Sequence, residues 1–372
     1  MSIQEDKLRI VIKVGSSSLT NRQGDLEPKK IKKIIDETAT LIQMNYQVII
    51  VSSGAVAAGY RQLGHTKPPK SLSERQAAAS LGQGVLIESY SRMFSEKSLY
   101  SAQILITRDD FLDEQKYNNI RNTINILLKN NAIPIINEND SVSSEEMNFG
   151  DNDSLAARVA GLLDANKLVV LSDIDGLFDK NPDTNNDATL LEQLTEITPE
   201  IEVMATESSS GIGTGGMKTK IEAMKIAMSS GIESFIGNAK IPNIIVDAIQ
   251  KKARGTYFIP KKRKQALSQR KKWIAFNSDT KGTIMIKTLK KSNTTTQFTI
   301  NDIVKIIGIF DEHDVVKIVD EDACVLGKGV VNHASGALHD FFVRKQTIDR
   351  AIVVVNVDEY VCSKEVPLLV GV

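Results

Sequence analysis

A glycine-rich segment, residues 211–220, carries the residue types best suited to chemistry: Gly-Ile-Gly-Thr-Gly-Gly-Met-Lys-Thr-Lys. Glycines let a backbone approach a ligand closely, and the helical pattern that follows would place N–H groups and a positive dipole end there. A lysine at such a point adds a compact charge for a phosphate. The segment fits neither the Walker A pattern nor the dinucleotide-binding pattern. We predict a nucleotide-phosphate loop, with a flexible surface loop as the alternative.

A second lysine stands at the end of the first predicted strand. Residues 9–14 are mostly β-branched and include Lys13, and Gly15 with three serines follows. A lysine that ends a buried strand beside glycine and hydroxyl groups can reach a phosphoryl group in transfer. The alternative is a capped turn in which the lysine side chain extends to solvent.

Small residues follow the second predicted strand, and amide and acidic residues follow a later one. Residues 52–59 are Ser-Ser-Gly-Ala-Val-Ala-Ala-Gly, which leave room for a ligand or allow close helix packing. Residues 137–140 are Asn-Glu-Asn-Asp, and residues 150–153 are Gly-Asp-Asn-Asp just before a helical pattern. Such residues suit a substrate ammonium or outer contacts to Mg²⁺. Asp153 is also a plausible helix N-cap.

The remaining candidates lie after the next strand, where Ser172 and Asp173 could form the edge of a nucleotide site or a simple turn. The inventory is therefore two lysines, several carboxylates and glycine-rich loops, with no histidine base or hydroxyl nucleophile in a triad-like setting. Phosphoryl transfer relies on such groups because its catalysis is mainly positioning and charge stabilisation. No direct metal ligand is assigned from the sequence.

The elements that must position these residues alternate between strand-like runs and helical patterns over the first 260 residues. Continuous apolar strands between amphipathic helices predict a mostly parallel sheet with helices on both faces. The predicted strands are residues 9–14, 47–51, 102–106, 133–136, 167–171 and 234–236, and the predicted helices are residues 28–44, 73–94, 117–129, 153–163, 217–229 and 243–251.

The pattern changes after residue 250. Residues 251–272 hold ten basic residues and no acidic one, as in a solvated linker or a polyanion contact. Short β-type runs follow, which predict a small β-barrel. We predict a catalytic domain over residues 1–258, a basic linker over 259–274 and a β-barrel domain over 275–372.

The bulk composition excludes several classes of protein. The 372 residues are 41% hydrophobic and 25% charged, with a formal net charge of zero, so no global field steers the chain to nucleic acid or membrane. Two cysteines argue against a disulfide framework or a cysteine-ligated metal. No signal-peptide core and no run of 18 apolar residues occurs, which predicts a cytoplasmic protein.

Taken together, these motifs resemble the amino acid kinase family, and within it the branch that phosphorylates glutamate. The resemblance covers about residues 8–260 and implies ATP-dependent phosphorylation of the γ-carboxylate of L-glutamate to L-glutamyl 5-phosphate, the first step of proline biosynthesis. It also implies Mg²⁺ on the ATP phosphates, inhibition by proline and a homo-oligomer, a dimer or tetramer. The residues that carry it are 13–17, 52–59, 135–140, 150–153 and 211–220.

Carried over position by position, the resemblance implies that Lys13 and Lys220 stabilise the phosphoryl group during transfer and that Asp153 orients these two lysines. Glutamate would be held by Ser53, Asp140 and Asn152, with Asn137 and Asp151 nearby. The ATP site would be lined by Lys13, Ser172, Asp173, Thr214, Gly215, Gly216, Met217, Lys218, Thr219 and Lys220.

The C-terminal part resembles a PUA domain, an RNA-associated β-barrel, through residues 308–311, 315–318 and 327–331. It departs from that pattern at residues 284–290, which lack the usual acidic-glycine turn, and at 355–358, where a histidine-arginine pair is common. A structural or regulatory role and RNA binding therefore both stay open. Two other functions compete for the whole chain: an RNA-binding protein with a vestigial kinase domain, and a sibling kinase that acts on another acceptor.

Overall fold

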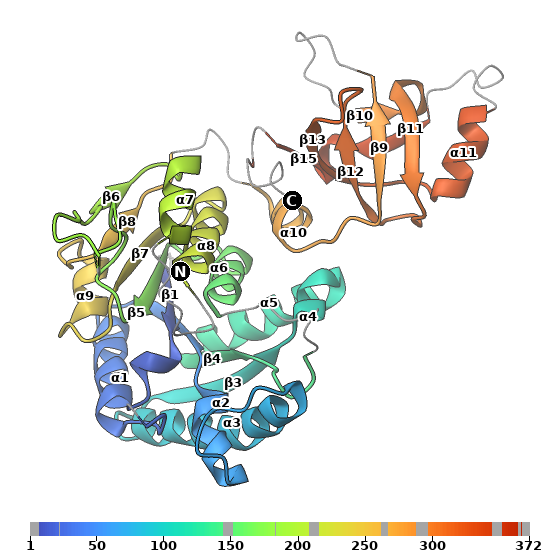
Figure 1. The fold of residues 1–372 in the computed structure, drawn as a ribbon. Coiled ribbons are helices and arrows are strands. Elements are labelled where there is room, and N and C mark those ends of the chain that lie inside the picture. Colours follow the sequence, from blue (N-terminus) through green and yellow to red (C-terminus); the bar gives the residue numbers. More distant parts are fainter. Residues whose placement is uncertain are drawn as a thin grey trace, which may run out of the picture. The chain divides into compact units, whose positions relative to one another are not determined.

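The computed structural model describes residues 7–21, 23–143, 152–182, 184–207, 216–261, 267–287, 297–343, 352–363 and 366. The chain forms two compact units, coloured blue to yellow and orange to red in Figure 1. The first unit comprises Met1–Asp110 and Glu114–Lys264, and the second comprises Phe111–Asp113 and Gln265–Val372. Within the described ranges, no helix combines the length and apolar character needed to cross a membrane.

The first unit is built on an eight-stranded sheet in the order β3-β4-β2-β1-β5-β7-β8-β6. The strands from β3 to β7 in this order are parallel, whereas β8 is antiparallel to β7 and carries β6 at the edge. The strands are β1 (Arg9–Val14), β2 (Gln47–Ser52), β3 (Tyr100–Ile106), β4 (Ala132–Glu138), β5 (Lys167–Ser172), β6 (Gln193–Leu194), β7 (Glu233–Asn238) and β8 (Thr256–Phe258).

Helices cover both faces of this sheet, which confirms the predicted mostly parallel architecture (Figure 1). One core cluster packs α1, α3 and α9 against β1, β2, β4 and β5. On the opposite face, α6 contacts β1, β2 and β5, while α5 contacts β4 and α8 contacts β7. The helices are α1 (Pro28–Gln43), α2 (Ala55–Gly59), α3 (Leu72–Ser95), α4 (Arg108–Leu112), α5 (Glu114–Lys129), α6 (Asn152–Leu162), α7 (Pro199–Glu207), α8 (Met217–Ser229) and α9 (Ile244–Ile249).

The central strand β1 marks the point where the strand order reverses, because β1 pairs with β2 on one side and with β5 on the other. Ligands of open parallel sheets bind beyond the carboxyl ends of the strands at such a point. The ends of β1, β2, β4 and β5 are followed by the polar segments that the sequence singles out. The topology therefore gathers segments from over 150 residues of chain at one edge.

Helices α2 and α3 pack backbone to backbone through two glycines. A Cβ atom on Gly82 would lie 1.8 Å from the carbonyl oxygen of Ala55, and one on Gly59 would lie 2.0 Å from that of Ala78. No larger residue fits either position without moving a helix. Close packing therefore accounts for the glycine that ends the 52–59 segment, and it fixes the start of α2 relative to α3.

The second unit holds a five-stranded sheet in the order β11-β9-β12-β13-β15 and a two-stranded sheet of β10 and β14. Residues 269–276, which begin in the predicted linker and extend two residues beyond it, form a helix in which Lys272 and Trp273 are buried. The Ser268 side chain caps this helix by accepting a hydrogen bond from the Lys271 N–H at 3.3 Å. The elements are α10 (Gln269–Phe276), β9 (Gly282–Ile286), β10 (Gln297–Thr299), β11 (Ile303–Gly308), β12 (Val315–Val319), β13 (Val325–Val330), α11 (Ser335–Val343), β14 (Val353–Asn356) and β15 (Tyr360–Cys362).

The close approach of α2 and α3 gives the first prediction. We expect Gly82→Ala to destabilise the first unit by about 1–3 kcal/mol, because the added methyl group overlaps the Ala55 carbonyl. Gly84→Ala on the same helix is the matched control, since a Cβ atom there meets nothing within 4 Å. Removing a helix-interior glycine at Gly84 should stabilise by up to about 1 kcal/mol. Urea unfolding followed by circular dichroism would measure both, and equal midpoints would contradict the packing argument.

Candidate active site

A cleft of about 550 Å³ lies at the carboxyl ends of the central strands. Its wall combines cations, carboxylates, amides and small residues, as a site for charged ligands requires. It brings together nine of the residues singled out from the sequence: Lys13, Ser53, Asn137, Asp140, Asn152, Asp153, Ser172, Asp173 and Lys220. The other lining residues are Gly15–Ser17, Gly54–Ala57, Pro68–Lys70, Arg75, Glu138 and Leu171.

At the centre of the cleft, one carboxylate lies between two lysines. Lys13 Nζ is 2.6 Å from Asp153 Oδ1, and Lys220 Nζ is 3.2 Å from Asp153 Oδ2. Asp153 has no solvent-exposed surface, and both lysines are buried. Lys13 therefore does not extend to solvent. Asp153 is the second residue of α6 rather than its N-cap, so its side chain is available for the lysines.

The charges explain how these groups can be buried together. Burial alone would raise the pKa of Asp153, but the ammonium groups of Lys13 and Lys220 outweigh burial and hold that pKa below its usual value. The carboxylate therefore stays ionised at neutral pH. Among the described residues, this cluster therefore holds two ammonium groups and one carboxylate, and all three line the cleft.

Asn152 organises the wall next to this charge cluster. Its Nδ2 group donates to Ser53 Oγ at 2.8 Å, to Asn137 Oδ1 at 2.8 Å and to the Ser52 carbonyl at 3.1 Å. The end of β2, the end of β4 and the start of α6 are thus tied to one amide. Ser53 and Asn152 consequently hold fixed positions at the cleft surface.

Asn137 lies behind Asn152 and is almost fully buried, with 2% exposure. Its Oδ1 atom accepts from Asn152 and from the Glu138 N–H, and its Nδ2 group donates to Gln83 Oε1 at 2.9 Å. These bonds use its amide within the protein. Asn137 thus supports Asn152. Gln83 on α3 completes the network and was not singled out from the sequence.

The start of α8 carries the described part of the glycine-rich segment. Gly216 is the N-cap of α8, Lys218 is exposed, and the Thr219 hydroxyl donates to the Gly216 carbonyl at 2.9 Å. Lys220 lies one turn into the helix and points into the protein, where it meets Asp153. Asp151, Thr214 and Gly215 lie outside the described residues, as do residues 211–213.

Ser172 and Asp173 stand at the end of β5. Ser172 is buried, Asp173 is exposed, and the Ser172 hydroxyl donates to Asp173 Oδ1 at 3.2 Å. Both residues line the cleft on the β5 side of β1, whereas Ser53 and Asn137 line it on the β2 side. The strand order therefore divides the cleft into two halves with the Lys13–Asp153–Lys220 cluster between them.

The far part of the β2 side carries a carboxylate and an arginine. Burial raises the pKa of Asp140, and the guanidinium of Arg75 partly offsets this. Arg75 lies in the first turn of α3, and Glu138 contributes a second carboxylate. Sequence reasoning named Asp140 and missed Arg75, because an arginine at the start of an amphipathic helix looks like an ordinary surface residue.

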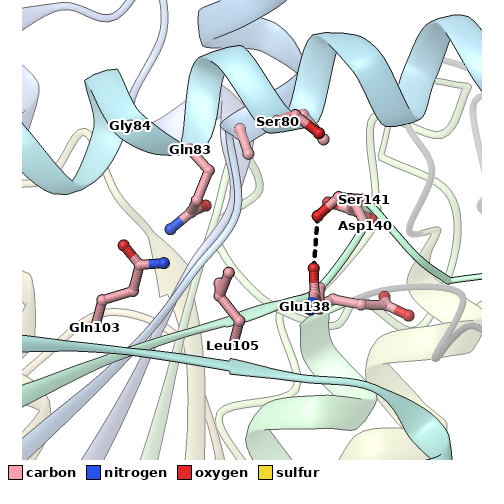
Figure 2. Close-up of a pocket in the computed structure, with 11 residues that line it drawn as sticks. Ser80, Gln83, Gly84, Gln103, Leu105, Glu138, Asp140 and Ser141 are labelled. Carbon is pink, nitrogen blue, oxygen red and sulfur yellow. Dashed lines mark hydrogen bonds between the residues drawn. The ribbon is translucent and has the colours of Figure 1, made fainter.

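A smaller cavity of about 270 Å³ adjoins this end of the cleft. Ala55, Glu138 and Asp140 line both cavities. Figure 2 shows Gln83 from α3 and Gln103 from β3 projecting into it from opposite sides, with Asp140 and Ser141 at a third side. Glu138 and Asp140 therefore lie between the cleft and the smaller cavity.

The described residues do not form a metal centre. Within the ranges that the structure describes, no group of three or more histidine, cysteine, aspartate or glutamate side chains could hold a metal ion. Mg²⁺ commonly binds through one or two carboxylates, waters and the phosphates of a substrate. The carboxylates Glu138, Asp140 and Asp173 line the cleft, so it offers the one or two carboxylates that such an ion uses.

Comparison with known proteins identifies relatives of this chain. A model of the amino acid kinase family matches residues 8–238. The chain is 48% identical to glutamate 5-kinase 2 of Bacillus licheniformis, over 97% of this chain and 98% of that protein. It is 45% identical to glutamate 5-kinase 2 of Bacillus subtilis (strain 168), over 98% of each. The solved structure of carbamate kinase from Giardia lamblia bound to AMP-PNP shares the fold, with a TM-score of 0.50, 18% identity and coverage of 69% of this chain and 99% of that one.

The buried cluster gives the second prediction. Asp153→Asn should lower the free energy of unfolding by about 3–5 kcal/mol, because it removes the carboxylate charge that pairs with two buried ammonium groups. Asp36→Asn is the matched control: Asp36 also pairs with two lysines, Lys32 at 3.2 Å and Lys97 at 2.6 Å, but its side chain is 43% exposed. That substitution should cost no more than about 1 kcal/mol. Equal losses in urea unfolding would contradict the importance of burial.

The stability that Asp153 contributes to the folded protein depends on pH in a defined direction. The pKa of Asp153 is lowered in the folded protein, so its stabilisation is fully present above the ordinary carboxyl pKa of 3.8 and is lost as the pH falls through the lower, folded value. The stability difference between the native chain and Asp153→Asn should thus be constant from pH 5 to 8. It should shrink only below about pH 4.

Proposed function

The chain belongs to the amino acid kinase family, and we propose that it transfers the γ-phosphoryl group of ATP to the γ-carboxylate of L-glutamate. The products would be ADP and L-glutamyl 5-phosphate, in the first step of proline biosynthesis. The observation that carries the proposal is the buried Lys13–Asp153–Lys220 cluster at the switch point of the sheet. The match to proteins named glutamate 5-kinase along nearly the whole chain supports the choice of acceptor.

The chemistry needs charge stabilisation more than it needs a base. A carboxylate oxygen of glutamate attacks the γ-phosphorus, an O–P bond forms, and the bond to the β,γ-bridging oxygen breaks with its electron pair left on ADP. The γ-carboxylate is already ionised at neutral pH, so no proton must be removed. The obstacle is repulsion between an anion and a polyanion. Groups that offset this repulsion supply most of the catalysis.

Two residues are placed to offset it. Lys13 projects from the end of β1 and Lys220 from the first turn of α8, so they approach the cleft from different elements. Asp153 holds both ammonium groups and prevents them from repelling each other before substrate arrives. We assign Lys13 and Lys220 to the phosphoryl group in transfer, and Asp153 to their orientation.

Glutamate would occupy the β2 side of the cleft. Asp140 would bind the α-ammonium group, while Ser53 and Asn152 would contact the substrate from the shared network of β2, β4 and α6. Asn137 would act by positioning Asn152. Asp151, which the resemblance places beside glutamate, stays a prediction.

ATP would occupy the β5 side, where Ser172 and Asp173 line the cleft. Its phosphates would reach the start of α8, at Gly216, Met217, Lys218 and Thr219, and the roles of Thr214 and Gly215 in the preceding loop stay predictions. Mg²⁺ bound to the β- and γ-phosphates would neutralise part of their charge.

Several further properties stay proposals. The resemblance to the family implies inhibition by proline and assembly into a dimer or tetramer. The sequence implies a cytoplasmic location. The second unit would be a PUA-like barrel, a proposal supported by its two small sheets of short strands. If this unit binds RNA, the whole chain should show an RNA affinity that falls as the salt concentration rises.

Coupled ADP release tests the proposed reaction. Purified protein with Mg²⁺-ATP should turn over L-glutamate and should not turn over L-aspartate, N-acetylglutamate or UMP at comparable rates. N-acetylglutamate should fail because it lacks the ammonium group that Asp140 would bind. Turnover of another acceptor alone would favour the sibling-kinase alternative, and folded, ATP-binding protein without any turnover would overturn the proposal.

The role of the second lysine gives a separate prediction. Lys220→Ala should lower kcat by about 10²–10³-fold, because one preorganised charge in a water-poor site contributes several kcal/mol to the transition state. Lys225→Ala on the same helix is the matched control. Lys225 forms an ion pair with Glu202 at 2.7 Å, and it is not among the residues that line the cleft. We expect near-native kcat from that variant. A native kcat in Lys220→Ala would remove Lys220 from the mechanism.

A further inference from the structure

We propose that Arg75 binds the α-carboxylate of the amino-acid substrate and, together with Asp140, selects acceptors that carry both charges on the α-carbon. The inference rests on the proposed function, because it concerns the binding of L-glutamate in the same cleft. It adds a specificity-determining residue that neither the sequence motifs nor the charge cluster identifies.

The first observation is the position of Arg75. It lies in the first turn of α3 and lines the cleft together with Asp140. Its side chain is half-buried. The backbone of this turn is already fixed, because the Arg75 N–H donates to the Ser71 carbonyl at 3.0 Å and α3 is locked against α2 by Gly82. Arg75 therefore presents its side chain to the cleft from a rigid support.

The second observation is that this guanidinium makes no ion pair and no side-chain hydrogen bond in the described part of the chain, although other half-buried arginines, such as Arg9 and Arg270, are hydrogen-bonded. A partly desolvated charge without a partner is unfavourable. An anion bound in the cleft would supply the partner, and a guanidinium matches a carboxylate through two parallel N–H···O bonds.

The third observation is the relation between Arg75 and Asp140. Both side chains line the same cleft, and although burial raises the pKa of the Asp140 carboxyl, the charge of the Arg75 guanidinium partly offsets that rise. Arg75 and Asp140 nevertheless form no ion pair within 4 Å. The Lys30–Glu27 and Lys33–Glu37 pairs, by contrast, lie within that distance. A cation and an anion held apart on the walls of one cavity complement a zwitterion whose charges are arranged in the opposite order.

The charge distribution fixes the direction in which such a zwitterion binds. The phosphoryl end of the cleft holds Lys13 and Lys220, so the γ-carboxylate must point there. The α-ammonium then meets Asp140, and the remaining α-carboxylate turns away from Glu138, a nearby like charge, toward Arg75. Lys70 also lines this end but is exposed, and a solvated ammonium gains less from binding an anion.

Substrate analogues that delete one charge at a time provide the test. 4-Aminobutyrate is glutamate without the α-carboxylate, and glutarate is glutamate without the α-ammonium. In the full-length protein we expect kcat/KM to fall about 10- to 100-fold from glutamate to 4-aminobutyrate, the range for a hydrogen bond to a charged group. Arg75→Ala should lose a similar factor on glutamate, mainly through KM. It should change little on 4-aminobutyrate, so the ratio between these two substrates should approach one.

Three comparisons make the result specific. Arg75→Ala should keep the native ratio between glutamate and glutarate, because that ratio reports the ammonium contact with Asp140. Arg75→Lys should restore part of the lost discrimination against 4-aminobutyrate. Arg92→Ala, an arginine substitution on the exposed part of the same helix, should keep both native ratios. Where 4-aminobutyrate turns over too slowly, its inhibition constant against glutamate replaces kcat/KM in the ratio.

The outcomes separate this inference from the proposed function. A native protein that does not phosphorylate glutamate contradicts the function itself. A native protein that does so, while Arg75→Ala still prefers glutamate over 4-aminobutyrate by the native factor, overturns the role of Arg75, even if the variant is less active overall. If Arg75→Ala does not fold, the same ratio measured in Arg75→Lys and Arg75→Gln decides: an unchanged ratio in both overturns the role.

Discussion

The contact on which the rest of the site depends is the pair of bonds from Asp153 to Lys13 and Lys220. Two lysines at one buried point would repel each other if no carboxylate lay between them. Asp153 lies between them, with Lys13 Nζ 2.6 Å from one of its oxygens and Lys220 Nζ 3.2 Å from the other. The same contact joins β1, α6 and α8, so it is a tertiary link as well as an electrostatic one.

This link explains why the sheet topology matters for function. Lys13, Asp153 and Lys220 are far apart in sequence, and only the strand order with β1 between β2 and β5 brings their elements to one edge. Once they meet, the cleft has two unlike sides. The β2 side carries amides and carboxylates, whereas the β5 side carries Ser172 and Asp173, and Lys220 of α8 lines the same cleft.

The amino-acid side depends on packing that is remote from the chemistry. The Asn152–Asn137–Gln83 hydrogen-bond chain connects the cleft wall to α3, and the glycine contact between α2 and α3 holds that helix in register. A shift of α3 would move Gln83 and Arg75 together. Positioning of this kind has a large effect on catalysis because small displacements of a bound reactant raise the barrier steeply.

The sequence by itself determined the parallel α/β architecture, because near-continuous apolar strands and periodic helices are local patterns. It also located α8, whose predicted and observed bounds are both residues 217–229, and it named Lys13, Lys220 and three of the carboxylates that line the cleft, Asp140, Asp153 and Asp173. The tertiary structure alone decided that Asn137 faces inward to Gln83, that Arg75 faces the cleft, and that a helix over residues 269–276 begins in the predicted linker. These features depend on contacts between distant segments, and such contacts leave no periodic trace along the chain.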